Sequence, residues 1–184
     1  QKGVMVSKDS KVVLVDSDSF QINALSTVYL CDAGTQHFTP PELQSLTSFA
    51  VTRTVNHDNF GLALLIFHLL FGARHPYAGV PLQNSAADVE LESNIKNFRY
   101  AYARDSQSRG IAPPPRSIPL SMVPDAMETM FHQAFTERGA QGARPTAQQW
   151  VAELDRVRGH LKKCSVSPMH VYQDHLVKCP WCAL

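Results

Sequence analysis

The sequence has 184 residues, of which 44% are hydrophobic and 18% charged, and its formal net charge is +1 at pH 7. This composition is typical of a globular chain with one ordinary domain and a small appendage, and its overall charge does not indicate nucleic acid as a partner. The longest apolar run, residues 62–71, is interrupted by His68 and is too short to cross a bilayer, so it predicts a buried helix and no membrane association. Because the chain begins with Gln1 and no secretory pattern follows, we expect a piece of a longer, cytoplasmic protein.

The first part of the chain predicts one β-hairpin followed by a long loop. Short β-branched runs at residues 4–6 and 11–15 are separated by a polar Ser-Lys-Asp-Ser stretch, which favours a hairpin. Residues 16–57 are rich in Ser, Thr, Asp and Pro and have no long period. We expect a loop with short ordered pieces there, and long loops in compact domains are usually functional or mobile.

The remainder of the body is predicted to be mainly helical. Residues 58–72 are apolar nearly all round and end at Gly72, which predicts a central helix. A weaker helical pattern over residues 83–103 is broken by the prolines that follow Ala112. A third helix is predicted after Pro124 by apolar residues at helical spacing, namely Met127, Met130, Phe131, Ala134 and Phe135.

A capping-box pattern, Thr146-Ala-Gln-Gln149, predicts the start of a last helix with Trp150, Val151 and Leu154 on one face. A two-stranded hairpin cannot supply a core alone. The sequence therefore predicts a mainly α fold with a small β-hairpin, in which the helices carry the core.

Three motifs in this order resemble the C-terminal lobe of protein kinases. Thr39-Pro-Pro-Glu42 is similar to the Ala-Pro-Glu run that ends the activation segment, and Asp58 to Gly72 resembles the central helix. Arg144-Pro-Thr146 resembles the run before the last helix. The resemblance covers residues 1–158 and leaves residues 159–184 as a separate tail.

The resemblance implies structural roles for three charged residues. In the family, the Arg of the last motif pairs with the Glu of the first, which here would join Arg144 to Glu42, and the Asp of the central helix anchors the catalytic loop, which here is Asp58. Without the resemblance, Glu42 and Arg144 are also consistent with solvated surface charges, and Asp58 with a plain helix cap.

The resemblance is less regular at the catalytic end. Asp16-Ser-Asp18 follows a predicted strand where the family has Asp-Phe-Gly, which implies that Asp16 binds magnesium and ATP, with Asp18 beside it. Gly3 falls where the family has an Asn as its second metal ligand. By the family's order the catalytic loop and the ATP-binding lysine would precede residue 1, so we expect this chain alone to be inactive. The alternative is that Asp16 and Asp18 are turn residues.

The last residues of the chain predict a structural zinc site. Cys179-Pro-Trp-Cys182 has the spacing of a zinc knuckle, and Cys164 with His170 completes a C-x5-H-x8-C-x2-C pattern. His175 is the competing ligand for His170. The alternatives are free thiols or a redox pair, although a redox C-x-x-C normally lies near a βαβ unit, and no such pattern is present. Cys31 is expected to be an ordinary thiol.

These patterns leave three functional hypotheses open. The overall pattern is closest to a bacterial group of kinase-like proteins, which implies that the complete protein transfers phosphate from ATP to Ser or Thr of a protein substrate. The changes at Ser17, Asp18 and Gly3 favour a pseudokinase scaffold that binds a partner protein without catalysis. A third hypothesis is a zinc-stabilised adaptor with a kinase-like architecture only, since a fold does not determine a function.

Overall fold

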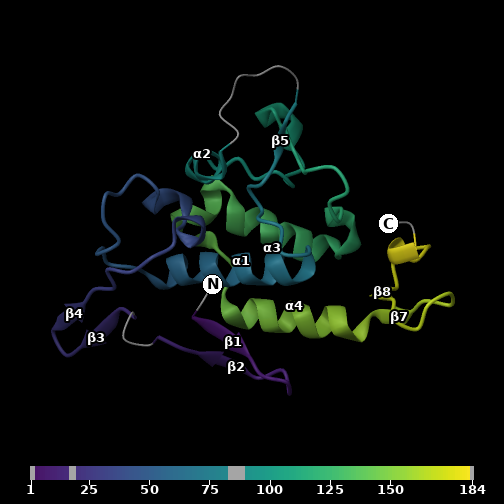
Figure 1. Cartoon of the computed structure of the whole chain (residues 1–184), viewed down its shortest axis with the longest axis horizontal. Helices are drawn as coiled ribbons and strands as arrows, with labels where there is room; N and C mark the ends of the chain where they lie inside the picture. The colour runs from purple at the N-terminus through teal and green to yellow at the C-terminus, as the bar shows by residue number, and fades with distance from the viewer. Residues whose placement is uncertain (1–2, 17–19, 83–89, 183–184) are drawn as a thin grey trace.

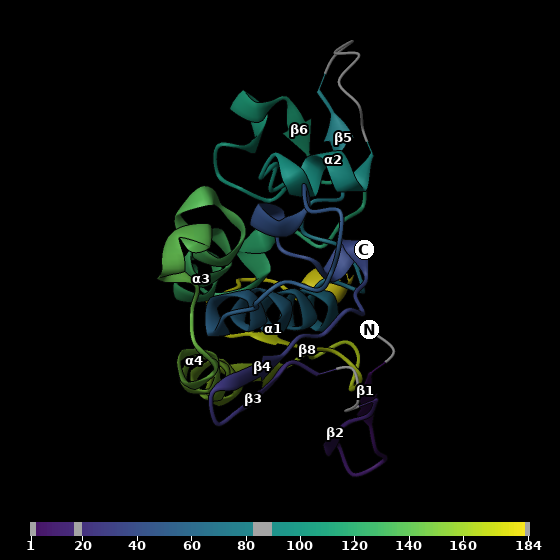
Figure 2. The same cartoon turned by 90° about the vertical axis from the view of Figure 1, so that its left-hand side faces the viewer.

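The protein is described from a computed structural model that covers residues 3–16, 20–82 and 90–182. A helical body surrounds the central helix α1 (Val55–Leu70), and the C-terminal tail lies at one end of the long axis (Figure 1). In Figure 2, helix α3 (Asp125–Phe135) lies above α1 and helix α4 (Ala147–Gly159) lies below it. Within the described residues, none of the helices combines the length and the apolar character needed to cross a membrane.

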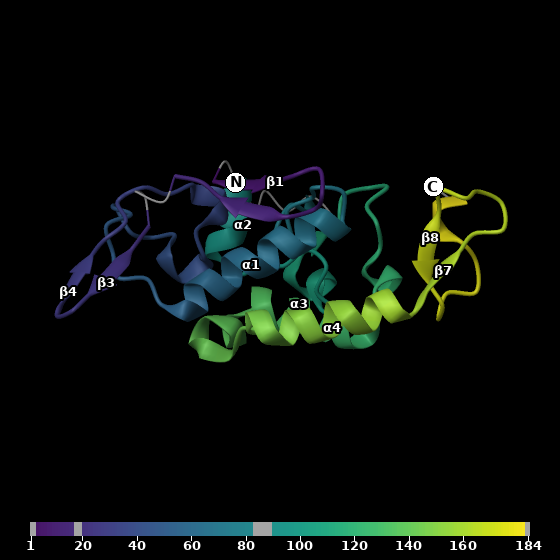
Figure 3. The ribbon, with the colours of Figure 1, turned by 90° about the horizontal axis from the view of Figure 1, so that it is seen from below.

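Two β-hairpins precede the helical body. The predicted one is confirmed: β1 (Val4–Val6) pairs antiparallel with β2 (Val12–Leu14). The second hairpin, β3 (Ile22–Ala24) with β4 (Thr27–Tyr29), falls where we expected a loop. Its turn carries Leu25 at a φ of 54°, a conformation that turn-forming Gly or Asn usually adopts, so no turn-forming residue marks this hairpin in the sequence. This hairpin lies at the end of the molecule opposite the tail (Figure 3).

Helix α1 begins at Val55, three residues before the predicted start. The backbone N–H of Thr54 donates a 3.1 Å hydrogen bond to His57 Nδ1, which closes the first turn. The predicted stop at Gly72 is confirmed, because Gly72 has a φ of 61° and the Ala73 N–H donates to the His68 carbonyl at 2.7 Å. This is the Schellman arrangement that ends many helices.

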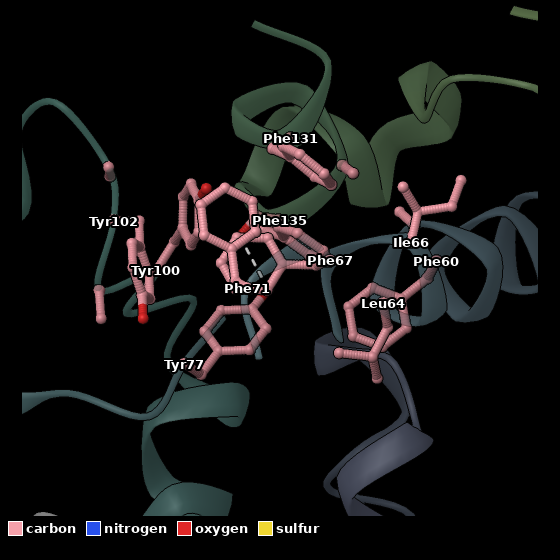
Figure 4. Close-up of a cluster of buried hydrophobic side chains, with 14 of the residues drawn as sticks. Phe60, Leu64, Ile66, Phe67, Phe71, Tyr77, Tyr100, Tyr102, Phe131 and Phe135 are labelled. Carbon is pink, nitrogen blue, oxygen red and sulfur yellow. Dashed lines mark hydrogen bonds between the residues drawn. The ribbon is translucent and has the colours of Figure 1, made fainter. Parts of the chain in front are cut away.

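Aromatic side chains from α1, from α3 and from other parts of the chain form much of the core (Figure 4). Phe67 of α1 stacks on Phe71 with ring centroids 4.3 Å apart and meets Phe131 of α3 edge-on at 5.1 Å. These rings are at most 1% exposed, and edge-to-face pairs add to the free energy gained from burial alone. The predicted central position of α1 is confirmed, although Leu69 is 82% exposed and shows that the helix is not buried all round.

The predicted helix over residues 83–103 is too long. Among the described residues of that range, only α2 (Leu91–Lys96) is helical, and residues 83–89 lie outside the described part of the chain. Phe98 has a φ of 52°, which ends the helix and turns Tyr100 and Tyr102 into the core. A short pairing of β5 (Val80–Pro81) with β6 (Ile111–Ala112) closes this region.

The last two predicted helices are confirmed, with one correction. Helix α3 begins after Pro124, and the Gln149 N–H donates to Thr146 Oγ1 at 3.3 Å, as the capping box requires. Trp150 is 1% exposed, but Val151 is 61% exposed and does not share its face. Consecutive helical residues point about 100° apart, so the buried face of α4 continues at Leu154 and not at Val151.

Candidate functional site

A third hairpin positions two residues of the predicted metal site. Strand β7 (Leu161–Lys163) follows α4 directly and pairs antiparallel with β8 (Val171–Gln173). Cys164 follows β7 and His170 precedes β8, so the register places them opposite each other. The Cys164 N–H donates to the His170 carbonyl at 3.0 Å, which fixes this pair at the end of the hairpin.

The other two cysteines lie on a tight turn held against the same hairpin. Cys179 precedes the 3-10 turn η7 (Pro180–Cys182) and Cys182 is its last residue, and the Cys182 N–H donates to the Cys179 carbonyl at 3.4 Å. The indole Nε1 of Trp181 donates to the Val171 carbonyl at 2.7 Å. This bond ties the turn to β8 and brings its cysteines to His170.

The four donor atoms have the spacing of a tetrahedral metal site. All lie within 4.8 Å of one another. Cys182 Sγ is 3.6 Å from Cys164 Sγ and 3.5 Å from His170 Nδ1, and Cys179 Sγ is 3.7 Å from His170 Nδ1. Ligands bound at zinc distances of about 2.0–2.3 Å in a tetrahedron are separated by about 3.6–3.8 Å. The cluster could therefore hold a metal ion and is consistent with zinc.

The thiols of the cluster affect one another's ionisation. Hydrogen bonds from the backbone N–H groups of Val166 and Ser167 lower the pKa of Cys164 to about 6. The hydrogen bond with Cys164, together with burial and the nearby Cys179, raises the pKa of Cys182 to about 11. One thiol of the cluster ionises readily and another resists ionisation, because thiolates this close repel each other. A divalent cation removes that conflict, since coordinating thiols are deprotonated outright.

His175, the competing ligand, points elsewhere. Its Nε2 lies 3.3 Å from the Ser121 carbonyl oxygen of the helical body. Gln173 Nε2 donates to the Val157 carbonyl of α4 at 3.1 Å. These contacts attach the tail to the body, and the donor set is that of Cys164, His170, Cys179 and Cys182.

A second charged site lies in the body, where Glu42 meets Arg144. Glu42 lies in the 3-10 turn η3 (Pro41–Leu43), and the fully buried Arg144 precedes α4. Arg144 Nη1 and Nη2 donate to the two carboxylate oxygens of Glu42 at 2.5 and 2.7 Å. Such a parallel pair is the strongest geometry available to an Arg and a carboxylate. The two residues are therefore not solvated surface charges.

Arg144 also contacts the backbone at two further places. Its Nε donates to the Ala134 carbonyl of α3 at 3.2 Å, and its Nη1 donates to the Asn56 carbonyl of α1 at 3.2 Å. Its guanidinium lies 5.1 Å from the centre of the Phe60 ring. Burial alone would raise the pKa of Glu42, but the hydrogen bonds and charge of Arg144 outweigh it and hold that pKa below its ordinary value. The pair is thus ionised at neutral pH.

The segment that carries Glu42 is fixed to the body by His75. His75 Nε2 lies 2.9 Å from the His37 carbonyl, and the Tyr77 N–H donates to His75 Nδ1 at 3.3 Å. His75 must therefore be neutral, with its proton on Nε2. Burial, together with the nearby His68 and His37, lowers the pKa of His75 to about 4, although the hydrogen bond to the His37 carbonyl acts in the opposite direction.

The residues predicted for the catalytic end are only partly described. Asp16 follows β2, is exposed and has a φ of 58°. The Val15 N–H donates to the Gly3 carbonyl at 2.9 Å, so position 3 lies opposite Val15, the residue that precedes Asp16. Asp18 lies outside the described residues. Asp58 is exposed in the first turn of α1, and the helix cap is Thr54, so the interpretation of Asp58 as the cap is wrong.

Several residues that build these sites were not found from the sequence. Asn56 Nδ2 donates to the Gly139 carbonyl at 3.0 Å, and the Arg144 N–H donates to Asn56 Oδ1 at 3.4 Å. The contacts of His57 and His75 were also missed. Each of these contacts either joins positions far apart in the chain or uses a histidine nitrogen as the acceptor. Local residue spacing predicts neither kind of contact.

The known proteins to which the chain is similar are named as protein kinases. It is 66% identical over 185 residues to Protein kinase YegI of Escherichia coli O157:H7 and 65% identical to Protein kinase YegI of Escherichia coli strain K12. The alignments include all of this chain, which spans 28% of the length of each relative. No protein family profile matches the chain. The similarity supports a protein kinase-like protein.

Replacing Arg144 by Met is expected to destabilise the protein strongly. It leaves the partly buried carboxylate of Glu42 without its partner, and removing one member of a buried pair costs about 3–5 kcal/mol. Urea unfolding measures the change. The control is Arg158→Met, because Arg158 is 80% exposed in its pair with Asp155 and should change stability by about 1 kcal/mol or less. A loss that small for Arg144→Met would contradict the structural role of the pair.

His75 is expected to make stability depend on pH. The pKa of His75 is 6.5 in the unfolded chain and is lowered to about 4 in the folded protein. Its contribution to stability is therefore complete above pH 6.5 and is lost as the pH falls from 6.5 towards 4. The shift corresponds to about 3 kcal/mol. His75→Gln, which is neutral at every pH, should flatten the loss of unfolding free energy over that range relative to the unsubstituted protein. Equal slopes for the His75 variant and the parent would refute the prediction.

Proposed function

We propose that this chain is the C-terminal lobe of a bacterial protein kinase-like protein, with residues 1–158 as the lobe and residues 159–184 as a tail folded around a structural zinc ion. The observation that carries the proposal is the paired Glu42 and Arg144, which joins the Thr39-Pro-Pro-Glu42 segment to the Arg144-Pro-Thr146 run beside α1. The identity to two proteins named as protein kinases supports it.

In the complete protein, the proposed reaction is phosphoryl transfer from ATP to a Ser or Thr of a protein substrate. Such transfer depends on positioning the phosphates and neutralising their charge with metal ions. Asp16 is exposed and held in an uncommon backbone conformation, a feature that clusters at active sites. Its carboxylate would bind magnesium, and Asp18 would assist. Asp16 alone cannot bind ATP, so catalysis requires other parts of the complete protein.

The alternative is a pseudokinase that uses the same fold to bind a partner protein. Gly3 favours it, because the position opposite Val15 offers no side chain as a second metal ligand. A single carboxylate holds magnesium poorly, since the ion prefers near-octahedral oxygen coordination. Both hypotheses use the Glu42–Arg144 pair in the same way and differ only at the end of the hairpin β1–β2.

The zinc ion is proposed to be structural. Four protein ligands fill the coordination sphere and leave no position for a reacting water. The tail has almost no buried apolar residue of its own among those described, so the free energy of metal binding would become its folding free energy. Thiolate ligands persist where thiols stay reduced, which is why we propose a cytoplasmic location.

Metal analysis of the purified protein is expected to give about one zinc per chain. His170→Ala should lower this content and make residues 159–184 sensitive to protease, because one of the ligands is lost. His175→Ala is the matched control and should keep the zinc, since His175 faces Ser121. A metal-free preparation whose tail resists protease equally well would refute the structural role.

Asp16→Ala is expected to reduce phosphate transfer by the complete protein to background. The assay is incorporation of label from radioactive ATP into the protein itself or a Ser/Thr-containing acceptor. Asp9→Ala, an exposed carboxylate in the turn of the same hairpin, is the control and should leave labelling unchanged. Equal labelling with Asp16→Ala would remove Asp16 from the mechanism. No labelling by the unsubstituted protein would favour the pseudokinase.

A further inference from the structure

The tail exposes an unusual number of apolar side chains. Among the large hydrophobic residues in the described part of the chain, five are at least 80% exposed, and three of these belong to the tail: Val166 at 80%, Met169 at 86% and Val177 at 94%. Single exposed apolar residues are ordinary, but several gathered on one small module indicate an interaction surface.

These three residues lie in loops that end at the metal cluster. Val166 and Met169 lie in the loop between Cys164 and His170, and Val177 comes two residues before Cys179. Because the donor atoms of the cluster lie within 4.8 Å of one another, the ends of both loops meet at the cluster. The tail that carries them lies at the end of the long axis, away from the hairpin β3–β4 (Figure 3).

Local hydrogen bonds hold both loops in place. The Val166 N–H donates to Cys164 Sγ at 3.3 Å and the Met169 N–H to Ser167 Oγ at 3.4 Å. In the second loop, the Leu176 N–H donates to the Gln173 carbonyl at 3.2 Å. An ordered loop loses less conformational entropy on binding than a mobile one, so these exposed side chains are prepared for a partner.

The charges beside the two loops are positive. Lys163 precedes Cys164 and Lys178 precedes Cys179, and both are exposed. Neither forms an ion pair with any described residue of the chain. Asp174, a carboxylate of the same tail, is already held by His160 Nδ1 at 2.9 Å. The surface thus combines apolar side chains with two cations that are available to an acidic partner.

We propose that Val166, Met169 and Val177, with Lys163 and Lys178, form a docking surface for an acidic amphipathic segment of a partner protein. The proposal rests on the metal-folded tail proposed above. Two available lysines are few for other anionic partners: lipid-binding segments use clusters of about four to eight Lys and Arg. Nucleic acid affinity likewise grows with the number of phosphates neutralised.

The test uses the zinc-loaded protein and a fluorescent peptide of about twelve residues that alternates Leu and Glu. We expect saturable binding that weakens as salt rises from about 50 to 300 mM, because exposed charges are screened. A peptide with Lys in place of Glu should bind at least about tenfold more weakly. No saturable binding up to about 1 mM, or equal binding of both peptides, would overturn the proposal.

Variants then locate the surface. The double substitution Val166→Ser with Met169→Ser, and the double substitution Lys163→Glu with Lys178→Glu, should each weaken binding about tenfold. Leu69→Ser is the matched control, because Leu69 is 82% exposed on α1 and should have no effect. Zinc content is measured for each protein. If the apolar variant loses its metal, the lysine variant alone tests the docking surface.

The remaining outcomes separate this proposal from the zinc proposal. Unchanged binding by zinc-replete variants, or tighter binding to anionic vesicles or a single-stranded oligonucleotide, refutes the docking surface and leaves the zinc site standing. Peptide binding should be lost from a preparation without metal, because the tail that carries the surface would unfold, and binding that persists there refutes a docking surface built by the metal-folded tail.

Discussion

The body of this protein depends on the buried guanidinium of Arg144. Arg144 is fully buried, and its guanidinium is satisfied by Glu42, by the carbonyls of Ala134 and Asn56 and by the face of Phe60. These partners belong to segments that are distant in the sequence, so the side chain fixes α1, α3 and the loop before α1 at once. A buried charge without partners costs several kcal/mol, which means that the segments must meet correctly or the arginine cannot be buried. The pair therefore specifies the arrangement as well as stabilising it.

Helix α4 connects this site to the metal cluster. It begins just after Arg144 and ends just before β7, and its 13 residues span about 20 Å. Trp150 anchors its buried face to the aromatic core, and the Val157 carbonyl at its far end accepts a hydrogen bond from Gln173 of the tail. The tail has little core of its own and is tied to the body mainly through polar contacts. Its position thus follows from a rigid helix, and its internal order follows from the four metal ligands.

Local chemistry explains which features could be predicted from the sequence. The zinc-like spacing, the capping box at Thr146 and the glycine stop of α1 are encoded within a few residues, and each is present. The hairpin β3–β4 was missed because Leu25 occupies a turn position without a turn-forming residue. The helix expected over residues 83–103 was overextended because the burial of Tyr100 and Tyr102 overrides its periodicity. The pairing of Glu42 with Arg144 came from a family resemblance, since no local pattern connects residues 102 positions apart.

The Glu42–Arg144 pair and the hairpin β1–β2 differ in what they imply about catalysis. The Glu42–Arg144 pair and the aromatic core organise a scaffold that an active kinase and a pseudokinase would share, so their integrity says nothing about phosphoryl transfer. The distinction rests on the hairpin β1–β2, where Asp16 is exposed and Gly3 is bonded to Val15, the residue before it. If a magnesium ion binds there, its remaining ligands must come from phosphate, water or other parts of the complete protein, because magnesium keeps a nearly octahedral shell.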